Sequence, residues 1–333
     1  MSFVPKTQPF NGRIKAVTLG TGDEAIVIGG QNVLPFYSFD APIENAPKIG
    51  IEVSDAMDSW DLPGLVELYA GCTTMAERAK KAESVPGVDF LCLHFESADP
   101  NGANRPTAEC VADAKAVAEV CTKPIVVLGC KNLEKDGELL GAIADALRGK
   151  NVEKDEKLLG AIADALRGKN ILCMSAKQEN CKTVGASVVM AGGQKVGAET
   201  ADDINLAKQL NIMLKKDANV PAEAIVMDIG TAAVGYGYEY AASTFDRIRL
   251  AALAQSDDDL QMPILATVSL DTYGVKESTA SAEDEPAWGC REERAIGMEV
   301  ATAAADLTGG ADAVVLRHPE TIATISKFIA ELV

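Results

Sequence analysis

Two loops in this chain concentrate side chains that could bind a ligand. The first follows the apolar run at 90–93 and carries His94, Asp99, Asn101 and Asn104. The second follows the apolar run at 225–227, begins at Asp228 and is rich in glycine and tyrosine. A buried strand that ends in polar residues and opens into such a loop is typical of the ligand-facing edge of a parallel sheet. Residues that only cap loops or form turns are of the same types, so a ligand-binding role and a purely structural role both stay open.

The chain has two histidines, His94 and His318, and each follows an apolar run. Together with Glu96 they could supply the two imidazoles and one carboxylate of a metal site. His318 also precedes Pro319, which makes it a candidate N-cap of a helix. A metal-dependent aldolase built on these three residues is therefore one hypothesis.

Other cofactor motifs are missing from the sequence. No G-x-x-x-x-G-K-[ST] or G-x-G-x-x-G pattern follows an apolar run, because residues 20–22 and 235–237 each lack the third glycine. The eight cysteines include no C-x-x-C pair. We therefore expect no nucleotide site and no iron-sulfur cluster in this chain.

Eight apolar runs alternate with segments of helical character, and this pattern positions the polar loops. Such an alternation favours a single (β/α)8 TIM barrel, with a doubly wound open sheet as the competing fold. A hairpin signal around residues 20–23 predicts an N-terminal extension, residues 1–48, that could plug one end of a barrel at 49–333. The expected strands span 49–53, 90–93, 124–128, 171–174, 188–191, 225–227, 264–268 and 313–316. Capping boxes are expected at Thr74 with Glu77 and at Ser175 with Gln178, and a helix is expected from about Ser243.

Between the third and fourth expected strands, residues 133–151 are repeated almost unchanged as 152–170. Only three positions differ, with Val152, Glu156 and Lys157 in the second copy. Each copy of the duplicated segment 133–170 can form one amphipathic helix. The ring of helices has room for one helix here, so we expect one copy to dock on the barrel and the other to lie outside it.

The composition limits the function classes. The chain has 333 residues, a formal net charge of -18 and a pI near 4.6. Such a charge argues against binding to nucleic acid or to an anionic membrane surface. No apolar run approaches the roughly 20 residues of a membrane helix, and nothing predicts a signal peptide. We therefore expect a cytoplasmic protein.

Several ordered motifs across the chain resemble the small, delta-type subunit of the corrinoid iron-sulfur protein of acetyl-CoA decarbonylase/synthase. The resemblance runs from about residue 12 to the C-terminus. The motifs are residues 97–104 (SADPNGAN), 178–180 (QEN), 203–212 (DINLAKQLNI), 235–240 (GYGYEY), 246–250 (DRIRL), 286–289 (PAWG) and 316–320 (LRHPE).

The resemblance implies a TIM barrel paired with a larger subunit that carries the iron-sulfur cluster and most of the contacts to a cobamide, a corrinoid cofactor. The pair would relay a methyl group from a methyltetrahydrofolate:corrinoid methyltransferase to acetyl-CoA synthase/CO dehydrogenase in the reductive acetyl-CoA pathway. On this hypothesis the chain itself supplies no catalytic residue and no metal ligand, but shields the cobamide. Residues expected to contact the cobamide or its domain are Asp99, Asn101, Asn104, Asp228, Gly235, Tyr236 and Gly237, with Gln178, Asn180, Arg317 and His318 as further candidates.

A second hypothesis belongs to a different class. The barrel could itself be a pterin-dependent corrinoid methyltransferase, in which Asp99, Asn101, Asn104 and Asp228 bind the edge of the pterin by paired hydrogen bonds. Binding of methyltetrahydrofolate by the isolated chain would favour this enzyme. A stable complex with a cluster-bearing subunit would favour the carrier.

Overall fold

The computed structural model describes residues 7, 9–57, 60–146, 169–190 and 194–333 of the chain. Its main sheet has eight strands in the order β8-β7-β6-β5-β4-β3-β10-β9, and every neighbouring pair is parallel. The strands are β3 (Lys48–Ser54), β4 (Phe90–His94), β5 (Ile125–Leu128), β6 (Leu172–Ala176), β7 (Lys195–Glu199), β8 (Ile225–Asp228), β9 (Leu265–Ala266) and β10 (Ala313–Leu316).

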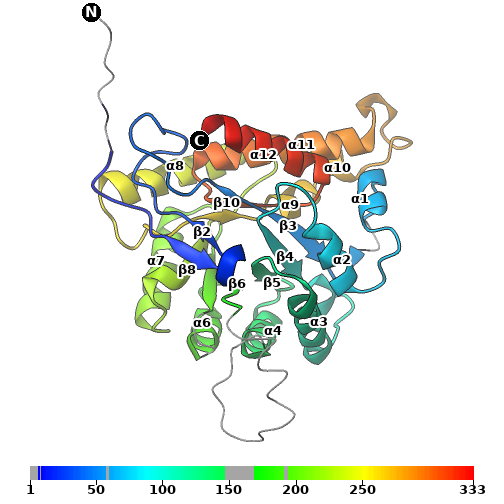
Figure 1. Cartoon of the computed structure of the whole chain (residues 1–333), viewed down its shortest axis with the longest axis horizontal. Helices are drawn as coiled ribbons and strands as arrows, with labels where there is room; N and C mark the ends of the chain where they lie inside the picture. The colour runs from blue at the N-terminus through cyan, green and yellow to red at the C-terminus, as the bar shows by residue number, and fades with distance from the viewer. Residues whose placement is uncertain (1–6, 8, 58–59, 147–168, 191–193) are drawn as a thin grey trace, which may run out of the picture.

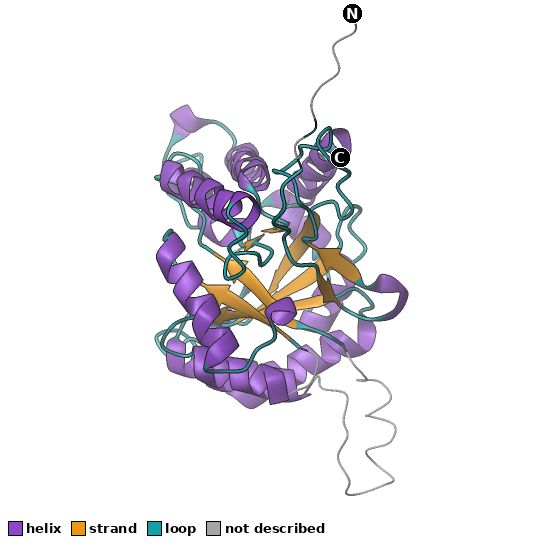
Figure 2. Ribbon diagram, turned by 90° about the vertical axis from the view of Figure 1, so that its left-hand side faces the viewer, coloured by secondary structure: helices purple, strands orange, loops and turns teal. Residues whose placement is uncertain are grey.

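The sheet closes on itself, so the prediction of a TIM barrel is confirmed and the open doubly wound sheet is wrong. The outer strands β8 and β9 are joined by a parallel bridge between Met227 and Ile264. Figure 2 shows the strands at the centre with helices around them. A closed parallel barrel brings the carboxyl ends of all its strands to one rim, which we call the mouth.

Helices surround the strands, as the ring in Figure 1 shows. The capping box predicted at Thr74 and Glu77 is present at the start of α2. Within the described residues the helices are α1 (Pro63–Leu68), α2 (Met75–Ala82), α3 (Thr107–Val120), α4 (Leu133–Ala146), α6 (Cys181–Met190), α7 (Ile204–Lys216), α8 (Tyr238–Ala254), α9 (Val268–Thr272), α10 (Lys276–Thr279), α11 (Arg291–Gly309) and α12 (Pro319–Leu332). None of these helices has the length and apolar character needed to cross a membrane.

The end of the barrel opposite the mouth is closed by the N-terminal hairpin. Strands β1 (Val17–Leu19) and β2 (Ile26–Ile28) pair antiparallel, as the sequence predicts. Their side chains Val17, Leu19 and Ile28 are buried in one apolar cluster with the inward-facing residues of the barrel strands. In Figure 1 the blue hairpin lies in front of the strands, inside the ring of helices. A ligand can therefore approach the interior only from the mouth.

Glycine at position 50 follows from the packing of the interior. A Cβ atom on Gly50 would lie 2.2 Å from the ring of Phe90 on the neighbouring strand, well inside van der Waals contact. Small barrels fill their interior by placing small residues beside large ones. Gly50 and Phe90 thus form one complementary pair of the barrel core.

The strand predicted at 188–191 is wrong. Residues 188–190 belong to helix α6, residue 191 lies outside the described residues, and the strand is β7 at Lys195–Glu199. A short apolar run followed by glycines fits a buried strand and the end of a buried helix equally well. The true strand contains Lys195, Gly197 and Glu199 and so has a weaker apolar pattern.

Three other boundaries differ from the sequence-based expectation. Ser175 does not cap a helix but lies in β6 with a positive φ of 67°. Strand β9 is shorter than expected, because helix α9 begins at Val268. Helix α8 begins at Tyr238, directly after Gly237 with its φ of 85°, and not near residue 243. These differences lie at the mouth, where loop conformation and not periodicity decides the end of an element.

The first copy of the duplicated segment forms α4, which packs between α3 and α6. Its side chains Leu139, Leu140 and Ile143 are fully buried, as expected for the copy that docks on the barrel. Most of the second copy, 152–168, lies outside the described residues. The placement of that copy stays a prediction.

One arginine joins helix α8 to the closed end of the barrel. Arg249 is 1% exposed, and its Nε donates a 2.9 Å hydrogen bond to the carbonyl oxygen of Gly310. Its Nη2 pairs with the carboxylate of Asp312, which also accepts a 2.7 Å bond from the backbone N–H of Ile264. The guanidinium therefore holds α8 against the beginnings of β9 and β10.

Candidate functional site

The mouth of the barrel is polar, in contrast to the apolar interior beneath it. Side chains alternate along a strand, so residues two positions beyond the inward-facing core point the same way. Below the mouth the interior is lined by residues such as Phe90, Cys92 and Val315. The inward positions that continue toward the mouth carry Glu52, His94, Glu199, Asp228, Thr267 and Arg317.

Glu52, His94 and Arg317 form one hydrogen-bonded unit at this level. The Oε1 atom of Glu52 lies 2.9 Å from Nδ1 of His94, and its Oε2 atom accepts bonds of 3.1 and 2.9 Å from Nε and Nη2 of Arg317. Burial acts to raise the pKa of Glu52, but Arg317 and His94 outweigh it and lower the pKa to about 2. Glu52 is therefore a buried carboxylate whose charge depends on Arg317.

Two aromatic rings hold the guanidinium of Arg317 in place. Its Cζ atom lies 4.1 Å from the ring centroid of Trp60 and 4.3 Å from that of Tyr273. Stacking on both faces fixes the plane of the guanidinium while its edge contacts Glu52. Glu299 then accepts hydrogen bonds from the backbone N–H groups of Arg317 and His318. The mouth thus has a rigid, preorganised side made from β3, β4, β10 and α11.

Asp228 lies at the end of β8 and is buried. Its Oδ1 atom accepts a 3.1 Å bond from the N–H of Gly230, and Oδ2 accepts a 3.4 Å bond from the hydroxyl of Thr267. Burial and the nearby charge of Glu199 raise the pKa of Asp228 to about 8. At neutral pH this carboxyl group therefore holds a proton and can donate a hydrogen bond into the mouth.

The raised pKa of Asp228 predicts a change of stability with pH. The native state keeps this proton up to about pH 8, whereas the unfolded chain loses it near pH 4, so Asp228 costs stability as the pH rises between these values. Relative to wild type, we expect the unfolding free energy of Asp228→Asn to be higher at pH 8 than at pH 4 by on the order of 5 kcal/mol. Urea denaturation at both pH values measures this gain. The exposed Asp23→Asn is the matched control, and an equal change in both variants would contradict the prediction.

The loop with Asp99, Asn101 and Asn104 bonds mainly to itself. Oδ1 of Asp99 accepts from the backbone N–H of Asn101 at 2.9 Å and from its side-chain amide at 3.2 Å. Asn104 is exposed, has a positive φ of 48° and donates its N–H to the carbonyl of Asp99. The contact between Asp99 and the N–H of Asn101 forms an Asx turn at the rim. Contact of this loop with a ligand stays a prediction.

Gln178 and Asn180 follow β6 and have different surroundings. The side chain of Asn180 accepts a 2.7 Å bond from the N–H of Lys177 and donates a 3.3 Å bond to the carbonyl of Ser175, so both ends of its amide are used within the loop. The Nε2 atom of Gln178 is buried and has no hydrogen-bond partner. Of the two residues, Gln178 alone keeps a free polar group.

The loop after β8 presents aromatic surface beside the mouth. Gly235 and Gly237 adopt positive φ angles of 95° and 85°, which turn the chain on both sides of Tyr236. Tyr236 is 49% exposed and its hydroxyl donates to Glu277, while Tyr240, in the first turn of α8, is 69% exposed. This rim combines two exposed rings with a protonated carboxyl nearby.

Among the described residues, His94, Glu96 and His318 do not form a group close enough to share a metal ion, so the structure gives the aldolase hypothesis no support. His318 caps α12, with Nδ1 accepting from the N–H of Glu320 at 3.2 Å and Nε2 lying 3.1 Å from Glu292. Glu96 is exposed on the loop after β4. Both ring nitrogens of His318 therefore have partners in its own chain.

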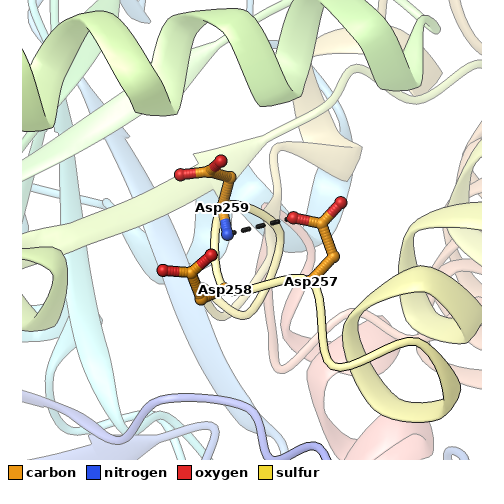
Figure 3. A group of neighbouring side chains, drawn as sticks. All are labelled: Asp257, Asp258 and Asp259. Atoms are coloured by element: carbon orange, nitrogen blue, oxygen red, sulfur yellow. Dashed lines mark hydrogen bonds between the residues drawn. The ribbon is translucent and has the colours of Figure 1, made fainter.

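Within the described part of the chain, one acidic group lies close enough together to hold a metal ion. It consists of Asp257, Asp258 and Asp259 in the loop between α8 and β9 (Figure 3). Asp257 pairs with Lys208 at 2.5 Å and Asp259 pairs with Lys215, while the N–H of Asp259 donates to Asp257. Lysines of α7 thus balance two of the three carboxylates, which indicates a structural loop.

The residues that organise the mouth are not evident from the sequence patterns. Glu52 is a charged residue inside an apolar run, IGIEVS, and that interruption is the signal that could have revealed it. Glu199 was hidden because its strand was placed too early. Trp60 and Tyr273 belong to loops around α1 and α9, where no periodic pattern indicates their contact with Arg317.

Solved structures with a similar backbone are dihydropteroate synthases. The enzyme from Xanthomonas albilineans with 4-aminobenzoic acid aligns with a TM-score of 0.53 and 14% identity over 95% of this chain and 98% of that one. The enzyme from Vibrio fischeri gives a TM-score of 0.54 and 11% identity at the same coverage. This likeness shows the fold alone, and the class that it defines is the (β/α)8 barrel.

The sequence then narrows the class to one family. Residues 16–323 match the model of the CO dehydrogenase/acetyl-CoA synthase delta subunit, and the chain belongs to this family. The acetyl-CoA decarbonylase/synthase complex subunit delta of Archaeoglobus fulgidus is 31% identical over 98% of this chain and 70% of its own length. Subunit delta 2 of Methanosarcina acetivorans is 30% identical over 94% of this chain and 67% of its own length.

Proposed function

We propose that this chain is the small subunit of a corrinoid iron-sulfur methyl carrier. It would pair with a larger subunit, help to enclose the cobamide, and so take part in relaying a methyl group from methyltetrahydrofolate:corrinoid methyltransferase to acetyl-CoA synthase/CO dehydrogenase. The match to the delta-subunit family over residues 16–323 is the observation that carries the proposal. Relatives named as subunits of an acetyl-CoA decarbonylase/synthase complex support it.

The two ends of the barrel differ, and this difference supports the mouth as the face for the cobamide. The hairpin residues Val17, Leu19 and Ile28 fill the closed end with apolar side chains. The mouth has polar groups from several strands and exposed rings at Tyr236 and Tyr240. A flat macrocycle with polar arms requires both kinds of surface. We therefore assign the mouth as the surface that covers the corrinoid.

The residues of the mouth fit a neutral polar ligand. The protonated Asp228 can donate a hydrogen bond to such a ligand, and the exposed rings of Tyr236 and Tyr240 offer it flat apolar surface. The corrinoid would supply the centre that accepts and gives up the methyl group. This chain would orient the ring through these groups and exclude water from it, as a rigid wall beside a mobile partner domain.

Purification from the native organism without oxygen tests this function. We expect the tagged chain to elute with a larger subunit in equal amount and with the visible absorbance of a corrinoid and an iron-sulfur cluster. A chain that elutes alone and without colour would overturn the proposal. Size-exclusion chromatography of the same sample separates a specific complex from carry-over on the affinity column.

A second candidate is a pterin-dependent corrinoid methyltransferase. It is supported by Asp228, whose protonated carboxyl at the mouth can pair with a ring nitrogen and carbonyl at the edge of a pterin. Titration of the isolated chain with methyltetrahydrofolate distinguishes the two functions. Micromolar binding that Asp228→Ala weakens about tenfold or more would favour the enzyme. No binding up to millimolar concentration would favour the carrier subunit.

A further inference from the structure

The unit of Glu52, His94 and Arg317 leaves one ring nitrogen of His94 without a partner. The side chain of His94 is 8% exposed, and its Nδ1 atom is held 2.9 Å from Oε1 of Glu52. Its Nε2 atom makes no hydrogen bond to any described residue. Nε2 is also not among the fully enclosed side-chain atoms of the described residues that lack a partner. This nitrogen therefore keeps accessible surface, and a ligand can reach it.

The strand register turns Nε2 of His94 toward the mouth. His94 is the last residue of β4 and lies on the same side of the strand as the inward-facing Phe90 and Cys92. Glu52 is in register with Cys92, so it lies one layer deeper in the barrel than His94. Because Nδ1 of the ring is directed down to Glu52, Nε2 on the other side of the ring is directed up to the mouth.

The charge of Glu52 decides which ring nitrogen carries the proton. Arg317 donates hydrogen bonds of 3.1 and 2.9 Å to Oε2 of Glu52, and although burial acts to raise the pKa of this carboxyl, it is lowered to about 2. A carboxylate can only accept hydrogen bonds, so Nδ1 of His94 is the donor. The neutral ring has one N–H group, which leaves a lone pair on Nε2. His94 thus presents an oriented hydrogen-bond acceptor to the mouth.

A packing role alone does not explain these three residues. Removing a carboxylate and a guanidinium from water is costly, and apolar residues of similar volume often give equal or higher stability. A histidine that serves only the core has both nitrogens bonded, as His318 has. The contacts around His94 instead fix the ring and leave one acceptor open to the mouth, which is what a binding site for a hydrogen-bond donor requires.

The ligand that complements this acceptor is neutral and carries an N–H group. A carboxylate or phosphate group without a proton has no donor for Nε2 and would lie near the charge of Glu52. A metal ion is opposed by the guanidinium of Arg317, which is bound to the same carboxylate as the ring. It would also need further ligands, and within the described residues His94 belongs to no group of three possible metal ligands. A neutral N–H donor meets neither obstacle.

We propose that Nε2 of His94 binds the ligand of the mouth by accepting a hydrogen bond from one of its N–H groups, with Glu52 as the residue that positions the ring. This inference rests on the proposed function, because the amide groups on the side arms of a corrinoid supply such N–H donors. A pterin, the ligand of the second candidate function, also carries N–H groups on its ring. The chemistry at His94 is the same for both ligands, and chemical labelling distinguishes the two sources.

Labelling of the two histidines with diethyl pyrocarbonate gives the first test. This reagent acylates an unprotonated imidazole nitrogen that solvent can reach, and mass spectrometry of the peptides locates the label. In the isolated full chain we expect His94 to be labelled. We expect His318, which is 1% exposed and has partners at both ring nitrogens, to stay unlabelled. Absence of label at His94 would overturn the proposal.

The same labelling identifies the donor. It is repeated on the isolated chain saturated with methyltetrahydrofolate and on the native complex with its corrinoid. Protection of His94 in the complex alone identifies the corrinoid as the donor, and protection by methyltetrahydrofolate alone identifies a pterin. His94 that is labelled to the same extent in all samples would overturn the proposal.

Nuclear magnetic resonance of the chain with isotope-labelled histidine tests the role of Glu52. In wild type we expect the neutral ring of His94 to carry its proton on Nδ1. In Glu52→Gln the side-chain amide can donate to Nδ1 as well as accept from it, so the share of rings with the proton on Nε2 should rise. A loss of stability alone would not move this ratio. A wild-type ring with its proton on Nε2 would contradict the assignment of the acceptor.

Affinity in His94→Phe measures the hydrogen bond itself, since phenylalanine keeps the shape of a ring but lacks the acceptor. The probe is cobinamide with the corrinoid-depleted complex, or methyltetrahydrofolate with the isolated chain, whichever ligand protects His94. We expect binding to weaken about three- to tenfold. Thr308→Val, exposed on α11 and bonded only to its own helix, is the control and should bind as wild type does. Unchanged affinity in His94→Phe would show that the ligand covers His94 without bonding to it.

The outcomes separate the role of His94 from the proposed function. A native complex that holds corrinoid while His94 stays open to the reagent would remove the role of His94 and keep the carrier function. A chain that elutes without a partner or a corrinoid, but whose His94 is protected by methyltetrahydrofolate, would keep the role of His94 and remove the carrier function.

Discussion

Replacing Arg249 with methionine is expected to lower the free energy of unfolding by about 3–5 kcal/mol, the cost of breaking a buried ion pair from one side. Methionine fills a similar volume but leaves Asp312 without its cation and Gly310 without its hydrogen-bond donor. The variant loses the contact that holds α8 against β9 and β10. Urea denaturation measures the loss.

Arg247 provides the matched control for this experiment. It lies two residues away on the same helix, is exposed, and changes by the same substitution to Arg247→Met. Surface substitutions of this kind stay within about 0.5 kcal/mol. Equal losses in the two variants would contradict the assignment of Arg249 as the anchor of α8.

Replacing Arg317 with methionine is expected to cost about 3–5 kcal/mol at neutral pH for the same physical reason. In the wild type, Arg317 keeps Glu52 charged with a pKa of about 2, and without it a buried carboxylate has no cation. The stability that this pair gives is present above the unfolded pKa of Glu52 and is lost as the pH falls toward 2. The difference between variant and wild type should therefore shrink on acidification.

The control is Arg291→Met, which removes an exposed ion pair with Asp61. Such pairs contribute about 0–1 kcal/mol. Unfolding free energies of wild type and both variants at pH 7 and at pH 4 separate the two cases. A deficit of Arg317→Met that stays the same at both pH values would show that packing, and not the charge of Glu52, is responsible.

The barrel could be predicted because its strands repeat a simple signal. Seven of the eight expected runs overlap a strand of the barrel, since a strand buried on both faces must be apolar along its length. The exception, at 188–191, shows the limit of this signal. The end of helix α6 is as apolar as a strand, and β7 contains a lysine, a glycine and a glutamate.

The candidate site was harder to predict than the fold. Asp228 was found because a carboxylate directly follows an apolar strand, and the structure places it at the mouth. Arg317 lies between Trp60 and Tyr273, and Trp60 is more than 200 positions before the other two in the sequence, so only the closure of the barrel brings the three together. Thr200, whose hydroxyl has no hydrogen-bond partner, follows β7 directly. Its place at the mouth could not be predicted, because the sequence pattern placed this strand too early.

The central claim is that the mouth, and not the plugged end, covers the corrinoid. Hydrogen-deuterium exchange of the chain alone and in its native complex tests this claim most directly. We predict that protection in the complex is confined to the loops that follow β4, β6, β8 and β10, around residues 95–105, 177–180, 229–237 and 317–318. Protection at the hairpin residues 17–28, with no change at these loops, would contradict the account.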